Sequence, residues 1–129
     1  MTLEEAREFF ANDRYATALT GIRIEEAGPK HSVCSLKLTK DHCNALGAVM
    51  GGVFYTLCDF AFAVATNDRE NSTVTVTSQI SYLSAVKGDV LYATADVIKD
   101  GRRSCFYEIK VTDNLGTNVA VTMTNGMHL

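Results

Sequence analysis

The stretch from Asp41 to Asn67 constrains the fold of this chain more than any other part of the sequence. From Val49 to Ala65 nearly every residue is apolar, yet the run opens on Gly51-Gly52 and carries the carboxylate of Asp59 in its middle. A helix that is apolar on every side is normally buried. Burying a carboxylate costs free energy unless the group has hydrogen-bond or charge partners. The pattern therefore predicts a buried helix that carries a reactive centre; the alternative is a structural carboxylate tied to serine and threonine hydroxyls.

The length and charge of the chain bound the class of protein. A chain of 129 residues is long enough to bury a substantial core without disulfides or metals. We expect a single domain over residues 1–129, with residues 1–20 as an N-terminal helical segment. A formal net charge of −3 argues against a nucleic-acid partner, because binding phosphates normally requires a concentrated basic face.

The sequence predicts neither secretion nor membrane insertion. The N-terminus carries acidic residues where a signal peptide would carry basic ones. The central apolar run has about the minimum length for spanning a bilayer, and it contains Asp59 and a glycine pair. We therefore expect a cytoplasmic protein without a membrane partner.

The cysteines do not indicate a metal site or a disulfide framework. The chain has four cysteines, all far apart in sequence and without a CxxC pair. In a cytoplasmic protein such cysteines are reduced thiols. Adjacent His42 and Cys43 rarely converge on one atom, and no second ligand pair has zinc-like spacing. No metal and no cofactor are expected.

The order of predicted elements indicates an α+β fold. Before the central helix we expect a short helix and two strands joined at Gly28-Pro29; after it the apolar period changes to two, which is typical of strands. The predicted ranges are helices at 3–12 and 49–66 and strands at 22–27, 32–38, 73–82, 90–98, 104–111 and 118–125. Consecutive strands with tight turns form an antiparallel sheet, and the single long helix must be covered by it. Part of the outer sheet surface, or an edge strand, is then expected to be buried by a second subunit.

The first turn of the central helix is a candidate oxyanion hole. The backbone N–H groups of Gly51 and Gly52 are free, and because glycine has no Cβ, an oxyanion can approach them closely. Asn44 can add a side-chain amide, and Asp59 can act as a base or nucleophile. Glycine pairs also let helices pack tightly, so the pair alone decides little.

The spacing of these groups predicts a site shared between two subunits. Eight residues separate Gly51 from Asp59, or about 12 Å along a helix. One carbonyl group cannot contact both ends of that distance. If both act on the same bond, Asp59 must come from one subunit and Gly51 from another, with two helices antiparallel across a two-fold axis.

The same stretch resembles a known family signature. The segment HCNALGAVMGGVFYTLCDFAFAVATN is similar to that of hotdog-fold thioesterases of the phenylacetate-degradation (PaaI-like) type, which reads H-x-N-x-x-G-x-x-H-G-G followed by an aspartate within the helix. The matching positions are His42, Asn44, Gly47, Gly51, Gly52 and Asp59. The resemblance implies the hotdog fold, an antiparallel sheet wrapped around one long central helix.

The resemblance also implies an activity and roles for single residues. The expected reaction is hydrolysis of an aryl- or medium-chain acyl-CoA thioester, in a homodimer with shared active sites or a dimer of dimers. Asp59 would be the base or nucleophile, and the Gly51 N–H with the Asn44 amide would polarise the thioester carbonyl. Thr75 would place the water, with Thr77, expected on the same strand face, as the alternative. Substrate-binding candidates are Gly52, His42, Met50, Thr77, Lys87, Gly101 and Arg102, of which Lys87, Gly101 and Arg102 would contact CoA.

One position departs from the family pattern. Met50 stands where the family commonly has the histidine of H-G-G, so a polar group near the thioester is missing. The backbone N–H groups do not depend on that side chain. A non-catalytic acyl-CoA-binding hotdog protein is the alternative function, and Met50 is the argument for it.

His42 is expected to hold its loop rather than perform chemistry. Hotdog hydratases carry their acid–base pair in a proline-bearing loop motif, and nothing here matches it.

Overall fold

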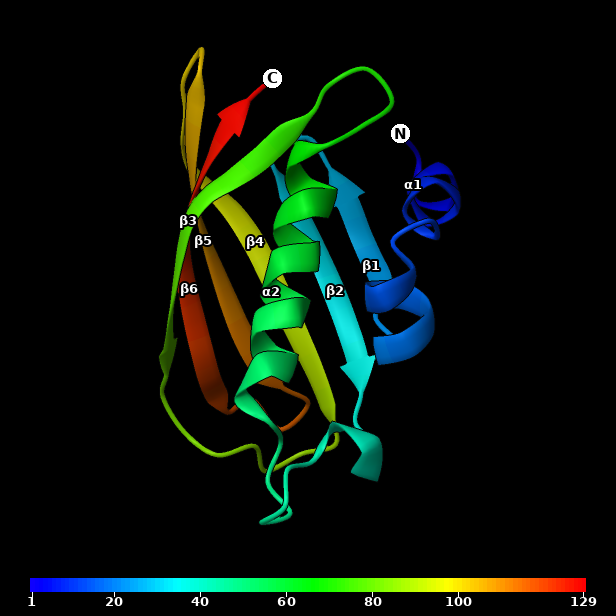
Figure 1. Cartoon of the computed structure of the whole chain (residues 1–129), viewed down its shortest axis with the longest axis vertical. Helices are drawn as coiled ribbons and strands as arrows, with labels where there is room; N and C mark the ends of the chain where they lie inside the picture. The colour runs from blue at the N-terminus through cyan, green and yellow to red at the C-terminus, as the bar shows by residue number, and fades with distance from the viewer.

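The long apolar stretch forms the central helix of the molecule. The structure, a computed structural model, describes residues 1–129, and helix α2 (Gly51–Thr66) lies against the concave face of a curved sheet (Figure 1). The other helical segments are α1 (Leu3–Phe10), the π-helix η1 (Tyr15–Thr20) and the 3-10 turn η2 (Lys40–His42). No helix of the structure is long and apolar enough to cross a membrane.

The sheet has six strands, and each strand is antiparallel to the strands next to it. Their order is β1-β2-β4-β5-β6-β3, which places β3 and β1 at the two edges. The strands are β1 (Arg23–Gly28), β2 (His31–Lys37), β3 (Thr73–Tyr82), β4 (Val90–Asp100), β5 (Ser104–Asp113) and β6 (Asn118–His128). The predicted strands are all present, and the α+β hotdog architecture is confirmed.

The core lies between α2 and the sheet. Leu57 and Ala61 of α2 are fully buried, as is Ala93 on the facing side of β4. Close approach at the other end of α2 depends on Gly126 of β6, where an added Cβ would lie 2.8 Å from Phe62 Cζ. The sheet therefore follows the helix along its length, and small residues set how closely the two approach.

The expectation that α2 is buried on every side is wrong for the single chain. Gly52, Tyr55 and Asp59 are exposed, and their spacing places them on one side of the helix. This exposed stripe faces away from the sheet because a six-stranded sheet covers α2 from one side only. Asp59 is therefore accessible from outside the chain.

The prediction that Thr75 and Thr77 share one face of their strand is also wrong. A β-bulge interrupts the pairing of β3 with β6, so Thr75 pairs with Gly126 while Thr77 pairs with the next residue, Asn125. Paired residues of an antiparallel ladder point to the same side, and adjacent residues point to opposite sides. Thr75 thus faces α2, whereas Thr77 lies on the outer face and donates its hydroxyl to Asn125 Oδ1 at 2.6 Å.

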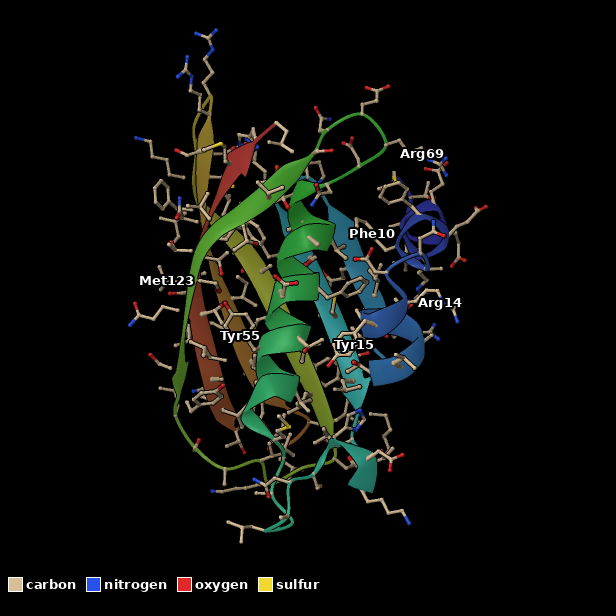
Figure 2. All side chains as sticks on the ribbon, in the orientation of Figure 1. Phe10, Arg14, Tyr15, Tyr55, Arg69 and Met123 are labelled. Atoms are coloured by element: carbon tan, nitrogen blue, oxygen red, sulfur yellow. The ribbon has the colours of Figure 1, made fainter.

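The N-terminal segment packs beside α2 at the β1 edge. Thr2 and Glu5 form a reciprocal capping box at the start of α1. The ring of Phe10 meets that of Phe60 of α2 edge-on, with centroids 5.9 Å apart. In Figure 2, Phe10 and Tyr15 lie between this segment and α2, whereas Tyr55 lies on the β3 side of the helix. The N-terminal segment therefore flanks one side of the exposed stripe.

Candidate active site

The first turn of α2 has unoccupied backbone donors. Met50 is the N-cap residue and makes no side-chain capping bond, so the N–H groups of Gly51 and Gly52 have no acceptor within the helix. The Tyr82 hydroxyl donates to the Gly51 carbonyl at 3.0 Å. A Cβ on Gly51 would lie 3.0 Å from that hydroxyl oxygen, so the contact favours glycine here. The donors point toward the solvent-accessible end of the helix, where an anion is favoured.

Asn44 presents a free amide next to this turn. Its Oδ1 accepts the backbone N–H groups of Leu46 and Ala48 at 3.0 and 3.2 Å. Two backbone donors fix which end of the side chain is oxygen, and the Nδ2 group is left without a partner. Gly47 completes this tight loop with φ of +84°, a conformation that glycine adopts without strain. The loop thus fixes the position of the Asn44 amide group and leaves its N–H donors free to bind a ligand.

His42 is engaged entirely within the chain. Its Nδ1 accepts the backbone N–H of Thr39 at 3.0 Å, so the proton of the neutral ring is on Nε2, which contacts the Thr20 carbonyl at 2.8 Å. The ring therefore ties the loop before α2 to the end of η1. This geometry fits a role in holding the loop, and it leaves neither ring nitrogen free for a substrate.

Asp59 lies two turns further along α2 and has an unusual electrostatic environment. Desolvation by surrounding protein raises the pKa of its carboxyl, and the nearby charge of Asp13 raises that pKa further. Asp13 follows α1, and its backbone is fixed because its N–H donates to the Phe10 carbonyl at 2.9 Å. Sequence reasoning missed Asp13, because no pattern connects residues so far apart. Desolvation and the Asp13 charge thus both increase the affinity of the Asp59 carboxylate for a proton.

Contacts between α2 and β3 indicate which residue of the strand lies level with Asp59. The helix and the strand run in opposite directions, since Tyr82 contacts Gly51, the Tyr55 hydroxyl donates to the Ser78 carbonyl at 3.3 Å, and the Thr73 hydroxyl contacts the Thr66 carbonyl at 3.3 Å. Asp59 lies between the last two levels. Asp59 is about one helical turn past Tyr55, a rise of about 5.4 Å, which is close to two ladder positions of β3, about 6.6 Å. Because Val76 is the extra residue of the bulge, two ladder positions from Ser78 lead to Thr75.

The remaining predicted residues are not gathered at one point. Lys87 lies in the loop before β4, and Gly101 and Arg102 lie in the turn after it. The length of β4, 11 residues, corresponds to about 36 Å. Lys87 and Arg102 of one chain therefore cannot contact the same phosphate.

Two pockets lie at the two ends of α2. A pocket of about 770 Å³ adjoins the helix N-terminus, and Gly51, Phe54 and Tyr82 are among its lining residues. A pocket of about 470 Å³ lies at the C-terminal end of α2. Gly101 and Arg102 line that pocket. His128 lines it too, with its Nδ1 2.9 Å from the Thr73 hydroxyl oxygen and its Nε2 2.6 Å from Asp100 Oδ1.

Comparison with protein families decides the class of protein. Residues 46–120, from the loop before α2 to the start of β6, match the family described as the thioesterase superfamily. The chain belongs to the thioesterase superfamily. The match spans both the first turn of α2 and Asp59 of this thioesterase, and it begins two residues after Asn44.

Named relatives of this thioesterase include two acyl-coenzyme A thioesterases. The chain is 30% identical to acyl-coenzyme A thioesterase PaaI of Escherichia coli over 119 residues, covering 92% of this chain and 84% of the relative. It is also 30% identical to human acyl-coenzyme A thioesterase 13 over 102 residues, covering 77% of this chain and 73% of the relative.

Solved structures agree with the fold. The E. coli PaaI protein from the phenylacetic acid degradation operon superposes with a TM-score of 0.85 at 25% identity, covering 100% of this thioesterase and 96% of that chain. A hypothetical thioesterase from Streptococcus pneumoniae, solved with coenzyme A, has a TM-score of 0.84 at 25% identity, covering 93% and 96%.

Proposed function

We propose that this thioesterase hydrolyses acyl-CoA thioesters at a site formed where two copies of the chain meet. The observation that carries the proposal is the first turn of α2, where the N–H groups of Gly51 and Gly52 lack an intrahelical acceptor and the Asn44 amide has no partner. Such fixed donors stabilise the oxyanion that forms when a thioester carbonyl is attacked. The names of the acyl-coenzyme A relatives support CoA as the leaving group.

Asp59 supplies the base in this proposal. It takes a proton from a water molecule, whose oxygen attacks the carbonyl carbon, and the resulting oxyanion accepts hydrogen bonds from Gly51 and Asn44. The carbon–sulfur bond then breaks, and the CoA thiolate takes the proton back from Asp59. Thr75 lies level with Asp59 on the face of β3 that is turned toward α2, and its hydroxyl positions the water. A raised proton affinity makes the carboxylate a better base, provided that it is ionised.

The two halves of the site come from different subunits. α2 is continuous from Gly51 to Asp59, so its rise keeps them about 12 Å apart along the axis. The exposed stripe of α2 leaves Asp59 accessible to a second copy. An antiparallel partner helix brings Gly51 of one subunit to Asp59 of the other, which a two-fold axis repeats at a second site. A homodimer, or a dimer of two such dimers, satisfies this geometry.

Residues at the periphery bind the rest of the substrate. Gly52 allows close approach at the helix start, and exposed Met50 contacts the thioester where a histidine is common in the family. Arg102, with the backbone of Gly101, binds CoA phosphate at one end of the sheet, and Lys87 is available at the other end, from the partner subunit.

The test is thiol release from a panel of aryl- and fatty-acyl-CoAs. Asp59→Ala is expected to lower kcat/KM at least about a hundredfold, the scale of losing a positioned acid–base group. Lys110→Ala, an exposed change on β5 outside the proposed site, is the matched control and should retain wild-type turnover. Unchanged turnover in Asp59→Ala would remove this carboxylate from the mechanism.

A second candidate function is binding of acyl-CoA without hydrolysis. Met50 favours it, because this side chain cannot provide the hydrogen bond of the usual histidine. Wild-type protein that binds acyl-CoA but releases no thiol from any member of the panel would establish this function instead.

A further inference from the structure

The pocket at the N-terminus of α2 adjoins the proposed reaction centre. This groove, of about 770 Å³, is bounded by the loop before α2 and by the loop between β3 and β4. Val119 and Phe54, both buried, line it together with Leu38 and Val86. Its size lies within the range of pockets that enclose most of a small-molecule ligand.

The groove begins at the group that would hold the thioester carbonyl. Gly51 and Tyr82 both line it, and the hydrogen bond from the Tyr82 hydroxyl to the Gly51 carbonyl joins them. The rings of Phe54 and Tyr82 meet edge-on with centroids 5.9 Å apart. An acyl group whose carbonyl oxygen lies at the Gly51 N–H therefore has the groove directly beside its next carbon atoms.

The lining of the groove fits a hydrocarbon. Aliphatic side chains from four segments contribute to it, and its charged residues are Lys40 and Asp89, both exposed. Asp89 is already paired with Lys37 and accepts a hydrogen bond from Asn114 Nδ2 at 2.9 Å. A chain of methylenes thus meets no unpaired buried polar group. A hydroxylated aromatic acyl group would find no buried partner for its hydroxyl, and burying such a group unpaired is unfavourable.

Size distinguishes further between aliphatic and aromatic acyl groups. A benzoyl group is a compact disc that would leave most of the groove empty. The side chains that line the empty part would then lack van der Waals contacts with the substrate. A flexible aliphatic chain that begins at Gly51 can extend over the apolar side chains of the loop between β3 and β4, which include Leu83 and Val86. Each methylene that it buries there adds a similar hydrophobic increment.

We propose that this groove holds the linear aliphatic chain of the substrate, so that the enzyme prefers medium- to long-chain acyl-CoAs over aryl-CoAs. This inference rests on the proposed thioesterase function and extends it to the class of acyl group. Ala85, an exposed residue that lines the groove, offers a position at which the groove can be narrowed without disturbing the core.

The test compares kcat/KM for butanoyl-, octanoyl-, dodecanoyl-, benzoyl- and phenylacetyl-CoA. The value should rise from butanoyl to octanoyl by up to about fourfold per methylene, and octanoyl-CoA should exceed both aryl esters. Preference for an aryl ester over octanoyl-CoA, or no dependence on chain length, would overturn the proposal.

Narrowing the groove provides a second, independent readout. Ala85→Phe should lower kcat/KM for dodecanoyl-CoA at least about tenfold, the scale of one or two lost methylene contacts, and should lower it much less for butanoyl-CoA, whose short chain makes fewer such contacts. Retained butanoyl-CoA activity also shows that the variant folds. Ala11→Phe, an equally exposed change at the end of α1, is the control and should alter neither. An equal loss with both esters in Ala85→Phe would contradict the assignment.

Binding separates this inference from the proposed function. S-dodecyl-CoA and S-butyl-CoA are thioethers that cannot be hydrolysed, and their affinities can be measured by calorimetry. Tighter binding of the dodecyl compound, abolished in Ala85→Phe, supports the groove even if no thioester is cleaved. Equal affinities for the two thioethers would contradict it even if thioesters are hydrolysed.

Discussion

At the scale of single residues, Asp59 and Asp13 form an electrostatic pair. Desolvation and the charge of Asp13 both raise the pKa of Asp59, and desolvation raises the pKa of Asp13 itself. Other titratable side chains near this part of α2 are Tyr55 and Cys58 on the helix and Tyr15 on η1 (Figure 2). A base of raised proton affinity is effective only above its pKa, so in the proposed mechanism this pair would set the acid limit of activity.

Removing the charge of Asp13 should extend activity to lower pH. In Asp13→Asn the pKa of Asp59 falls, so Asp59 stays ionised at lower pH and the acid limb of the kcat/KM profile moves to lower pH. Asp13→Glu keeps the charge and should leave the limb near its wild-type position. The measurement is the pH dependence of kcat/KM with one acyl-CoA. An acid limb that does not move in Asp13→Asn would show that the two carboxylates are uncoupled in catalysis.

Much of the candidate site follows from sequence at this scale. Asn44, Gly51 and Asp59 lie within one short stretch, where loop, helix start and helix spacing are readable from the chain. The pairing of Asp13 with Asp59 and the contact of Tyr82 with Gly51 join distant segments. Such contacts depend on how α1 and β3 pack against α2, and no local pattern encodes them.

At the scale of elements, the packing of α2 on β6 depends on one glycine. An added Cβ at Gly126 would lie 2.8 Å from Phe62 Cζ, 2.9 Å from Thr73 Cγ2 and 2.9 Å from the Val74 carbonyl oxygen. Two of these neighbours are buried side chains and the third is backbone, so none can move freely. The position therefore tolerates no side chain without displacement of the helix or the strand.

Gly126→Ala should accordingly destabilise the protein. Overpacking of a well-filled core costs about 1–3 kcal/mol, which urea unfolding followed by circular dichroism can measure. The matched control is Gly28→Ala at the end of β1, where an added Cβ would meet nothing within 4 Å. This control should change stability by less than about 0.5 kcal/mol, as is usual for surface positions. Equal stability of Gly126→Ala and wild type would mean that the helix shifts at little cost.

The elements were predictable from periodicity, whereas their irregularities were not. Strand alternation gave every strand, and the apolar run gave α2. The bulge that separates Thr75 from Thr77 cannot be read from the sequence, because Val76, the extra residue, continues the alternation of valine and threonine along the strand. The π-helix η1 likewise has no periodic signal of its own in six residues. Side-chain direction on β3 was therefore the least predictable feature of the site.

At the scale of the whole molecule, the edge strand β3 exposes apolar side chains. Val74 is 44% exposed and Val76 is 53% exposed, and β3 pairs with a neighbour on one side only. An exposed edge with apolar side chains is a surface for pairing with another chain. It lies next to the exposed stripe of α2, so a second copy seated here covers both.

A charge on this edge should separate the subunits. Val76→Lys is expected to shift the protein toward monomer in analytical ultracentrifugation and to lower kcat/KM at least about a hundredfold, because each monomer keeps only half of a site. Leu115→Lys, at an exposed turn between β5 and β6, is the control and should preserve both assembly and activity. A monomeric Val76→Lys with wild-type activity would show that one chain suffices.

The sharing of the site between subunits is tested most directly by mixing two inactive variants. Asp59→Ala and Asn44→Ala homodimers should each be nearly inactive, since every site lacks one group. In a mixed dimer, one site has both lesions and the other has intact Asp59 from one subunit and intact Asn44 from its partner. Verified mixed dimers should therefore recover about half of the wild-type turnover, the share of one intact site in two. Mixed dimers no more active than the two parent variants would contradict a shared site.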